Sequence, residues 1–375
     1  MPHTHTPTMQ SRGLLAVFAL LAVLGSALAW SKGQIPRREM QPAAAAPDLQ
    51  LYREVVAEVR GGKSYYDAAR VKIPQFGFPI SSPLNWRLPT YAWLFALLPL
   101  PRYVQALLVL LSLAALLLAY RAQTKNGPAL VAAFTLLALL GVVRWSLDGD
   151  AYLAQEPWAA TLIAISLATH SLGGRWRSAS VAAGTTALLF RELALPYCGI
   201  ACLSAAWNRR WRECAAWAAG IALFFAFFAW HVSQVRGQLA GMEAAAPGAG
   251  LAQWLRLGGL DFVLLTTRMN GLLFAAPAAL VWLYLLASLV GLAHRGDETS
   301  RLACLAALAY LLAFAILGRP ENFYWGLLPA PLLAWGTASA PAALARLWQA
   351  AQADIPAVPF VTPSPAGAGQ PPAET

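Results

Sequence analysis

The sequence predicts an all-α polytopic membrane protein with about ten transmembrane helices and a long outer first loop that bears interfacial amphipathic helices. Apolar residues make up 58% of the 375 residues, and the mean hydropathy is +0.53. Charged residues make up only 12%, about half the share found in soluble domains. Basic residues fall in short turns between apolar segments, which is typical of a helical membrane protein.

Ten apolar segments account for the predicted crossings. They are residues 13–30, 103–120, 128–144, 158–172, 179–190, 193–207, 214–232, 270–292, 302–318 and 323–340. The segments 179–190 and 193–207 are short for full crossings, and they predict a hairpin whose tip, Arg191 and Glu192, lies below the membrane surface. The first segment also resembles a cleavable signal peptide, and in either case the segment after it is exported.

The basic residues between the segments predict the orientation. If every segment crosses, one side holds Arg12, Arg121, Lys125, Arg175, Arg177, Arg209, Arg210, Arg212, Arg295, Arg301 and Arg346. By the positive-inside rule that side is cytoplasmic, and both termini lie there. The net charge of +10 is then spread along a membrane face, so nucleic acid is not expected as a partner.

This topology divides the chain into three parts. We expect a cytoplasmic N-terminus at 1–12 and a transmembrane domain at 13–345, whose first outer loop covers 31–102. Residues 346–375 are rich in Pro and Ala, and they predict a disordered cytoplasmic tail.

The first outer loop begins with DLQLYREVVAEVRGG, a helical pattern with Leu51 and Val55 on one face. It predicts an amphipathic helix on the membrane surface. A second short helix is expected to start after Ser64, and an apolar helix too short to span is expected at about 90–99. Together they predict surface helices around a polar, aromatic floor. The alternative is a plain amphipathic anchor in which Asp48 only caps the helix.

Other charged residues fall on the same predicted face. Asp148 and Asp150 form a D-x-D pattern, which fits a divalent cation site or, alternatively, a solvated acidic turn. Arg191 and Glu192 lie inside apolar sequence, where charges are costly and usually face a cavity or a partner. The alternative for this pair is a salt bridge that holds helices together.

A last outer segment, GRPENFYWG, brings further polar and aromatic groups to this face. Arg319 ends one crossing, and Pro320 breaks the helix after it. Glu321, Asn322 and Tyr324 follow at the outer interface. The alternative is an aromatic belt followed by a helix start.

Arginines and carboxylates therefore converge on the outer face at membrane depth. Arginine suits bidentate phosphate binding, a nearby carboxylate can act as a general base, and aromatic side chains stack on sugars. This combination suits a lipid-linked phosphosugar as donor. An acceptor hydroxyl, deprotonated by the base, would attack the anomeric carbon with inversion, and the lipid phosphate would leave under arginine stabilisation. A divalent cation (Mg²⁺ or Mn²⁺) would fit this chemistry, but nothing in the sequence requires a cofactor.

Several short motifs carry a resemblance to a known family. They are DLQLYREVVAEVRGGKSYY from Asp48, NWRLPTYAW from Asn85, QEPW from Gln155, FRELALPY from Phe190 and GRPENFYWG from Gly318. Their order and spacing resemble the GT-C superfamily of integral membrane glycosyltransferases. More closely, they resemble a bacterial group named for cell-surface glycopolymer formation. The resemblance covers roughly residues 13–340.

The resemblance implies roles for particular residues. The catalytic acidic residue of that superfamily commonly lies in the first outer loop, which corresponds to Asp48, and basic residues near the outer surface bind polyprenyl phosphate. The candidates for binding the donor phosphate are Arg87, Arg191 and Arg319. The candidate substrate-binding residues are Tyr52, Tyr65, Tyr66, Glu192, Glu321, Asn322 and Tyr324.

The resemblance also implies partners and a location. The expected partners are a polyprenyl-phosphate sugar donor, a glycan or lipid acceptor, and membrane lipids. The expected place is the bacterial cytoplasmic (inner) membrane, with the active site facing the periplasm. Two departures leave metal use and the acceptor open: Leu49 follows Asp48 where a second acidic residue is usual, and no soluble C-terminal domain of the kind many members carry is visible.

Two other classes of protein remain open. A transporter or flippase for lipid-linked sugars would share the phosphate site without needing a base, and would more often show internal repeats, of which the sequence has no clear case. A non-catalytic protein of envelope polysaccharide assembly would tolerate the loss of Asp48 and of the Arg191–Glu192 pair.

Overall fold

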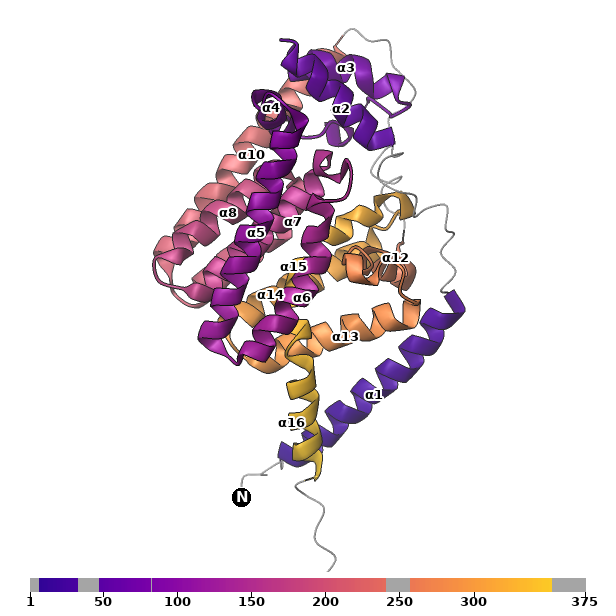
Figure 1. Cartoon of the computed structure of the whole chain (residues 1–375), viewed down its shortest axis with the longest axis vertical. Coiled ribbons are helices and arrows are strands. Elements are labelled where there is room, and N and C mark those ends of the chain that lie inside the picture. The colour runs from indigo at the N-terminus through magenta and orange to yellow at the C-terminus, as the bar shows by residue number, and fades with distance from the viewer. Residues whose placement is uncertain (1–6, 33–46, 82, 241–256, 353–375) are drawn as a thin grey trace, which may run out of the picture.

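The computed structural model describes residues 7–32, 47–81, 83–240 and 257–352, and the regular structure in these ranges is helical throughout. The α-helices are α1 (Pro7–Lys32), α2 (Pro47–Arg60), α3 (Tyr65–Gln75), α4 (Thr90–Leu97), α5 (Pro101–Asn126), α6 (Ala129–Val143), α7 (Gln155–Leu172), α8 (Trp176–Phe190), α9 (Leu195–Trp207), α10 (Trp211–Leu239), α12 (Gly259–Thr267), α13 (Ala278–Arg295), α14 (Glu298–Ile316), α15 (Ala330–Thr337) and α16 (Ala340–Gln352). The 3₁₀ turns are η3 (Pro83–Asn85), η4 (Arg144–Ser146), η5 (Ala151–Leu153), η6 (Glu192–Ala194), η7 (Gly271–Leu273) and η8 (Pro320–Leu327). Figure 1 shows α2, α3 and α4 together at one end, and α16 with the start of α1 at the other.

The helices confirm the predicted membrane architecture. Among the described residues, five stretches of helix are long and apolar enough to span a bilayer, and they are Pro101–Lys125, Ala129–Ser146, Trp211–Leu239, Ala278–Arg295 and Glu298–Ile316. The apolar helical stretches Leu14–Ala29 and Glu192–Trp207 are shorter. The chain is therefore an integral membrane protein.

Several boundaries differ from the sequence-based expectation. The crossing expected at 270–292 begins only at Ala278, because η7 and Pro277 interrupt the helix before it. The segment 323–340 is not one crossing, since Pro329 separates η8 from the short helix α15. Helix α16 continues to Gln352, beyond the expected domain end at 345, and the rest of the predicted tail lies outside the described residues.

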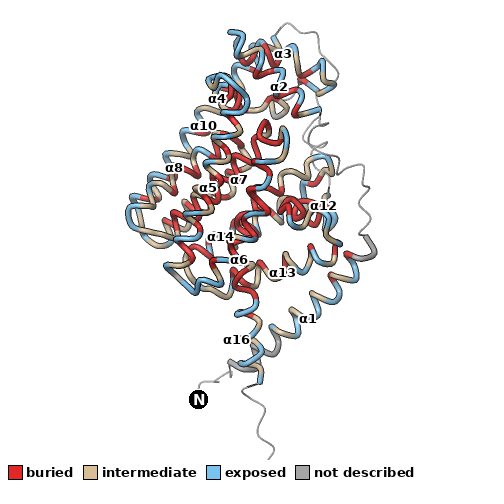
Figure 2. Tube along the Cα trace, viewed as in Figure 1, coloured by how far each residue is buried: buried red, intermediate tan, exposed pale blue. Residues whose placement is uncertain are grey.

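Helix α7 is the axis of the bundle. It is apolar around nearly its whole circumference, and Trp158, Ile163 and Leu167 are at most 1% exposed. Figure 2 shows it in the buried centre, while α1 at the edge is largely exposed or half-buried. Its only titratable side chains are Glu156 near one end and His170 near the other, so each end can be tied to the surrounding helices by charge.

The His170 end of α7 is held by two arginines and two glutamates. Arg210 Nε lies 2.6 Å from Glu213 Oε2, and Arg177 Nη1 lies 3.0 Å from the same oxygen. Both ring nitrogens of His170 face carboxylates. Nε2 lies 3.2 Å from Glu298 Oε1, and Nδ1 lies 3.6 Å from Glu213 Oε1. These contacts join the end of α7 to the starts of α8, α10 and α14.

Two more contacts bring the end of α5 to the same place. Lys125 Nζ donates to the Leu172 carbonyl at 2.9 Å, and Arg295 Nη1 donates to Gln123 Oε1 at 2.8 Å. The connections α5–α6, α7–α8, α9–α10 and α13–α14 therefore share one end of the bundle. We call it the basic end, after the arginines and lysine that its connections carry.

Close approach of backbones fixes α13 against α15. A Cβ atom placed on Gly291 would lie 2.0 Å from the Gly336 carbonyl oxygen, and one placed on Gly336 would lie 2.1 Å from the Ser288 carbonyl oxygen. Only glycine permits this contact, and small residues at helix interfaces are the usual means of tight packing in membranes.

The opposite end carries α2, α3 and α4, which we call the α2–α4 layer. The apolar face of α2, including Leu51, Val55 and Val56, is buried as the layer packs together. Ser64 caps α3 as expected, since its side-chain oxygen accepts from the Asp67 amide at 3.1 Å. Helix α4 occupies the range expected for the short apolar helix. Gln238 near the end of α10 donates to Asp67 at 3.0 Å and ties the layer to the bundle.

Candidate functional site

Arg87 lies at the centre of the candidate site, where the α2–α4 layer meets the bundle. Its Nε donates to the Tyr52 hydroxyl of α2 at 2.8 Å, and its Nη2 donates to the Tyr324 hydroxyl of η8 at 3.2 Å. Both partners are neutral, and no carboxylate within the described ranges forms an ion pair with Arg87. The guanidinium is therefore held in place without being neutralised, which suits the binding of an anion.

Asp48 lies in the first turn of α2, one helical turn before Tyr52. The helix begins at Pro47, so Asp48 does not occupy the N-cap position that the alternative reading required. Burial raises the pKa of Asp48 above its ordinary value of 3.8, and the charge of Glu156 adds to this effect, although Arg87, Arg191 and the Tyr324 hydroxyl oppose it. A half-buried carboxylate with a raised pKa is suited to accept a proton.

Arg191 is buried between two carboxylates. Its Nε lies 2.8 Å from Glu156 Oε1, and its Nη1 lies 2.8 Å from Glu192 Oε1. Helix α8 ends at Phe190, and Arg191 is extended (φ −146°, ψ 114°) before η6 begins. This break between α8 and α9 turns the guanidinium into the bundle, where the side chain is 1% exposed. The helix-joining salt bridge that the sequence left open is present, and a role in donor binding stays a prediction.

Glu156 was not among the predicted site residues. It lies in the first turn of α7 and is 2% exposed. Its charge raises the pKa of Asp48, and it forms an ion pair with Arg191. The signal in the sequence is a carboxylate at the start of an otherwise apolar helix, where a charge usually has a partner or faces a cavity. Its neighbour Gln155 is 1% exposed, and neither amide atom of that side chain has a hydrogen-bond partner among the described residues. Buried amides are rarely left unpaired, so Gln155 offers a polar contact to a ligand or to water.

Aromatic side chains support Arg87 from the layer. Tyr91 lies edge-on to Tyr52 with ring centroids 5.5 Å apart, and edge-on to Tyr65 at 6.2 Å. The Tyr65 hydroxyl donates to the backbone carbonyl of Arg87. Tyr65 and Tyr66 are 3% and 6% exposed, so this structure places them to hold the Arg87 backbone, while direct substrate contact stays a prediction. Tyr91 was not predicted.

Tyr66 is linked to the backbone before Arg87 through His231, a buried histidine of α10. The Tyr66 hydroxyl lies 3.0 Å from His231 Nδ1, and His231 Nε2 lies 3.2 Å from the Trp86 carbonyl. Because a carbonyl can only accept, Nε2 donates to Trp86, and Nδ1 shares the second hydrogen bond with the Tyr66 hydroxyl. The chain Tyr66–His231–Trp86 thus fixes the backbone immediately before Arg87.

The predicted residues of η8 divide into two pairs. Tyr324 donates to Asn322 Oδ1 at 3.3 Å and accepts from Arg87, so this pair faces the site. Arg319 and Glu321 form a longer ion pair of 3.9 Å, in which the side chains are 28% and 63% exposed. Of the three predicted phosphate-binding arginines, Arg87 and Arg191 both lower the pKa of Asp48. Arg319 lies at the more exposed start of η8.

Asp148 and Asp150 are both in ion pairs with arginine. Arg144 lies 3.5 Å from Asp148, and Arg53 of α2 pairs with Asp150, which ties the D-x-D turn to the α2–α4 layer. Within the part of the chain that the structure describes, no group of three or more His, Cys, Asp or Glu side chains is placed to hold a metal ion. A metal role for the two aspartates stays a prediction.

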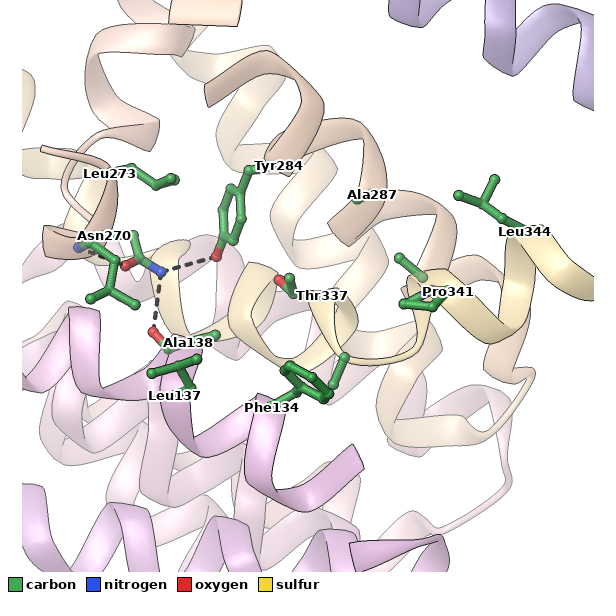
Figure 3. Close-up of a pocket in the computed structure, with 13 residues that line it drawn as sticks. Phe134, Leu137, Ala138, Asn270, Leu273, Tyr284, Ala287, Thr337, Pro341 and Leu344 are labelled. Carbon is green, nitrogen blue, oxygen red and sulfur yellow. Dashed lines mark hydrogen bonds between the residues drawn. The ribbon is translucent and has the colours of Figure 1, made fainter. Parts of the chain in front are cut away.

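A separate cavity of about 560 Å³ lies between α6, α13 and the corner from α15 to α16 (Figure 3). Its lining is apolar apart from Asn270, Tyr284 and Thr337. Asn270 Nδ2 donates to the Ala138 carbonyl and to the Tyr284 hydroxyl, each at 3.1 Å, and Thr337 Oγ1 donates to the Leu333 carbonyl at 3.0 Å, so these polar groups are hydrogen-bonded within the protein. The cavity is therefore mainly apolar, and none of the predicted site residues lines it.

The fold, unlike the sequence, matches proteins of known structure. No protein-family model and no curated protein matches the chain. The structure of ArnT from Cupriavidus metallidurans bound to undecaprenyl phosphate matches 87% of this chain with a TM-score of 0.51 and 18% identity. The apo state of the same protein matches 88% with a TM-score of 0.46 and 17% identity.

This likeness concerns the fold. The chain spans 60% of the length of the two solved structures that it matches. At 18% identity, the match to the undecaprenyl phosphate complex confirms the predicted polytopic all-α membrane architecture. It assigns no residue of this chain to a role.

Proposed function

We propose that this chain is a membrane glycosyltransferase of the GT-C type, which moves a sugar from a polyprenyl-phosphate donor to a glycan or lipid acceptor. The observation that carries the proposal is the placement of Asp48, a half-buried carboxylate with a raised pKa, within the field of Arg87 and Arg191. A base and an anion-binding guanidinium in one site are what this reaction needs.

Arg87 is the residue proposed to bind the donor phosphate. It is fixed by the neutral hydroxyls of Tyr52 and Tyr324, so its charge remains available to a ligand. Arg191 is neutralised in part by Glu156 and Glu192, and we propose that it acts chiefly by setting the field around Asp48. Arg319, at the exposed start of η8, is proposed to meet the phosphate as it arrives.

The proposed reaction is a single displacement. Asp48 takes the proton from an acceptor hydroxyl, and that oxygen forms a bond to the anomeric carbon of the donor sugar. The bond from the anomeric carbon to the phosphate oxygen breaks, and the electron pair leaves with the polyprenyl phosphate. Arg87 stabilises the charge on the leaving phosphate, and one displacement inverts the anomeric centre.

The sugar and acceptor are proposed to lie against the polar and aromatic groups around Asp48. Tyr52 and Tyr324 accept from Arg87, Tyr324 donates to Asn322, and the unpaired amide of Gln155 offers a further hydrogen bond. Asp148 and Asp150 would be the ligands for a divalent cation if one takes part, once their ion pairs with arginine open.

The choice of donor is supported by the fold. The solved structure with a TM-score of 0.51 is described as bound to undecaprenyl phosphate, a polyprenyl phosphate. We propose the same class of lipid for this chain, at the bacterial cytoplasmic membrane, with the site facing the periplasm. The arginine and lysine content of the basic end supports that orientation.

Sugar transfer in reconstituted vesicles tests the proposal. Vesicles with and without the protein receive labelled undecaprenyl-phosphate sugars, and the label is followed into lipid and glycan acceptors. The account predicts protein-dependent transfer and a product whose anomeric configuration is opposite to that of the donor. Movement of labelled donor across the bilayer without transfer would instead support a flippase, and neither activity with any donor would support a role in assembly.

A further inference from the structure

The turn between α9 and α10 exposes two tryptophans and two arginines at the basic end. We call residues 207–212, with the sequence WNRRWR, the α9–α10 tip. Trp207 is 87% exposed and Trp211 is 66% exposed, which is unusual for side chains of this size. Arg209 and Arg212 are also exposed. Aromatic and basic side chains that are exposed together are typical of the boundary between lipid headgroups and water.

The arginines of the tip are used in different ways. Arg210 turns inward and binds Glu213 and Glu298 of the cluster that holds the end of α7. Arg209 and Arg212 point outside this cluster, and neither forms an ion pair with a carboxylate in the described ranges. Arg210 therefore attaches the tip to the bundle, while Arg209 and Arg212 leave two positive charges on the surface of the tip without a carboxylate partner in the described ranges.

Arg209 has a strained, left-handed backbone conformation. Helix α9 ends in a Schellman motif, in which the Arg210 amide donates to the Ala205 carbonyl at 2.8 Å and the Arg209 amide donates to the Ala206 carbonyl at 2.9 Å. The residue that must be left-handed in this motif is usually glycine. Here it is Arg209, with φ of +55°, and no other described residue except glycine has a positive φ. Strain kept at one exposed position points to a use for the side chain.

We propose that the α9–α10 tip is a binding site for anionic phospholipid headgroups of the leaflet at the basic end. Arg209 and Arg212 would contact the phosphates, and Trp207 and Trp211 would lie at the level of the headgroups. Anionic lipid is the occupant that fits, because the site combines uncompensated positive charge with exposed aromatic surface in a protein that spans the bilayer. This inference does not rest on the proposed transferase activity.

Lipid binding to the purified protein tests the proposal. Wild type and an Arg209→Gln/Arg212→Gln variant are titrated in detergent with phosphatidylglycerol or with phosphatidylcholine, and bound lipid is counted by native mass spectrometry. Wild type should prefer phosphatidylglycerol. The affinity of the variant for this lipid should fall by roughly fivefold for each arginine, while its affinity for phosphatidylcholine stays unchanged. Unchanged affinity for phosphatidylglycerol would overturn the proposal.

Two further variants separate binding from folding. Arg209→Gly relieves the left-handed strain, so it should keep or raise the thermal stability while it lowers the affinity for phosphatidylglycerol. Arg70→Gln removes an exposed arginine of α3, and it should bind as wild type does. An equal loss in Arg70→Gln, or displacement of the lipid by millimolar inorganic phosphate alone, would contradict a lipid headgroup site at the tip.

Discussion

Arg191 and Glu156 form an ion pair inside the bundle, with 2.8 Å between Nε and Oε1 and with side chains that are 1% and 2% exposed. The pair joins the end of α8 to the start of α7 and places both charges within reach of Asp48. One contact therefore serves two purposes, since it holds the central helix and sets the electrostatic environment of the proposed base.

Removing Arg191 should destabilise the protein strongly. Arg191→Ala leaves the buried carboxylate of Glu156 without its partner, and breaking a buried pair in this way costs about 3–5 kcal/mol. Lys63→Ala, which removes an exposed pair with Glu58, is the control and should cost less than about 1 kcal/mol. Thermal unfolding in detergent measures both, and equal midpoints for the two variants would contradict the structural role of Arg191.

Arg87→Gln should impair use of the donor more than it impairs folding. The variant loses a charged donor to the proposed phosphate, and such hydrogen bonds contribute about 1.5–3 kcal/mol, so kcat/KM should fall by roughly 10- to 150-fold. Arg70→Gln changes an exposed arginine of α3 and should keep wild-type kinetics. Kinetics over a range of donor concentrations measure the effect, and a wild-type value for Arg87→Gln would remove this residue from the site.

The dependence of transfer on pH should reflect the raised pKa of Asp48. A base works in its ionised form, so the rate should fall on the acid side at a higher pH than the ordinary aspartate pKa of 3.8 would give. Tyr324→Phe removes a group that lowers this pKa, so the acid limb should move to still higher pH. Profiles of kcat/KM against pH for wild type and Tyr324→Phe measure the position of this limb. A limb that stays in place or moves to lower pH would speak against Asp48 as the base.

The same pKa shift predicts how Asp48 affects stability. Because the pKa is higher in the folded protein, the ionised carboxylate weakens the fold as the pH rises through that pKa. Asp48→Asn should therefore unfold at an equal or higher temperature than wild type at neutral pH. The difference should vanish below the unfolded-state pKa, where Asp48 is neutral in both states. A lower midpoint at neutral pH would mean that ionised Asp48 stabilises the fold.

Gly326 positions the segment that carries Tyr324. A Cβ atom on Gly326 would lie 1.9 Å from the Thr266 carbonyl oxygen of α12, so Gly326→Ala must push η8 away from that helix. We expect a loss of about 1–3 kcal/mol in stability, together with reduced transfer. Gly199→Ala is the control, since a Cβ there meets nothing within 4 Å and alanine favours the helix. Matching stability in both variants would show that η8 can move freely.

Local patterns in the sequence predicted the elements of the α2–α4 layer. The apolar spacing of Leu51 and Val55 gave α2, Ser64 gave the start of α3, and a short apolar run gave α4. These features depend on residues within one or two helical turns, so they can be read without knowing the fold.

The partners within the site could not be predicted in this way. His231 lies 165 residues from Tyr66, and Arg53 lies 97 residues from Asp150, yet each pair is in contact. Glu156 was missed for the same reason, because only the arrangement of α7 beside α8 shows that it faces Arg191. Similarly, the prolines around η8 marked a break without showing that the broken segment returns to Arg87.

Single-turnover sugar transfer by Asp48→Asn tests the central claim most directly. The variant keeps the size of the side chain and removes its basicity, and Asp67→Asn changes an exposed aspartate of the same layer as the control. Labelled undecaprenyl-phosphate sugar is bound to each protein in vesicles, and transfer to acceptor is followed over time. The account predicts that Asp48→Asn binds the donor but transfers at least about 100-fold more slowly, while Asp67→Asn matches wild type. Transfer by Asp48→Asn at the wild-type rate would contradict the assignment of the base.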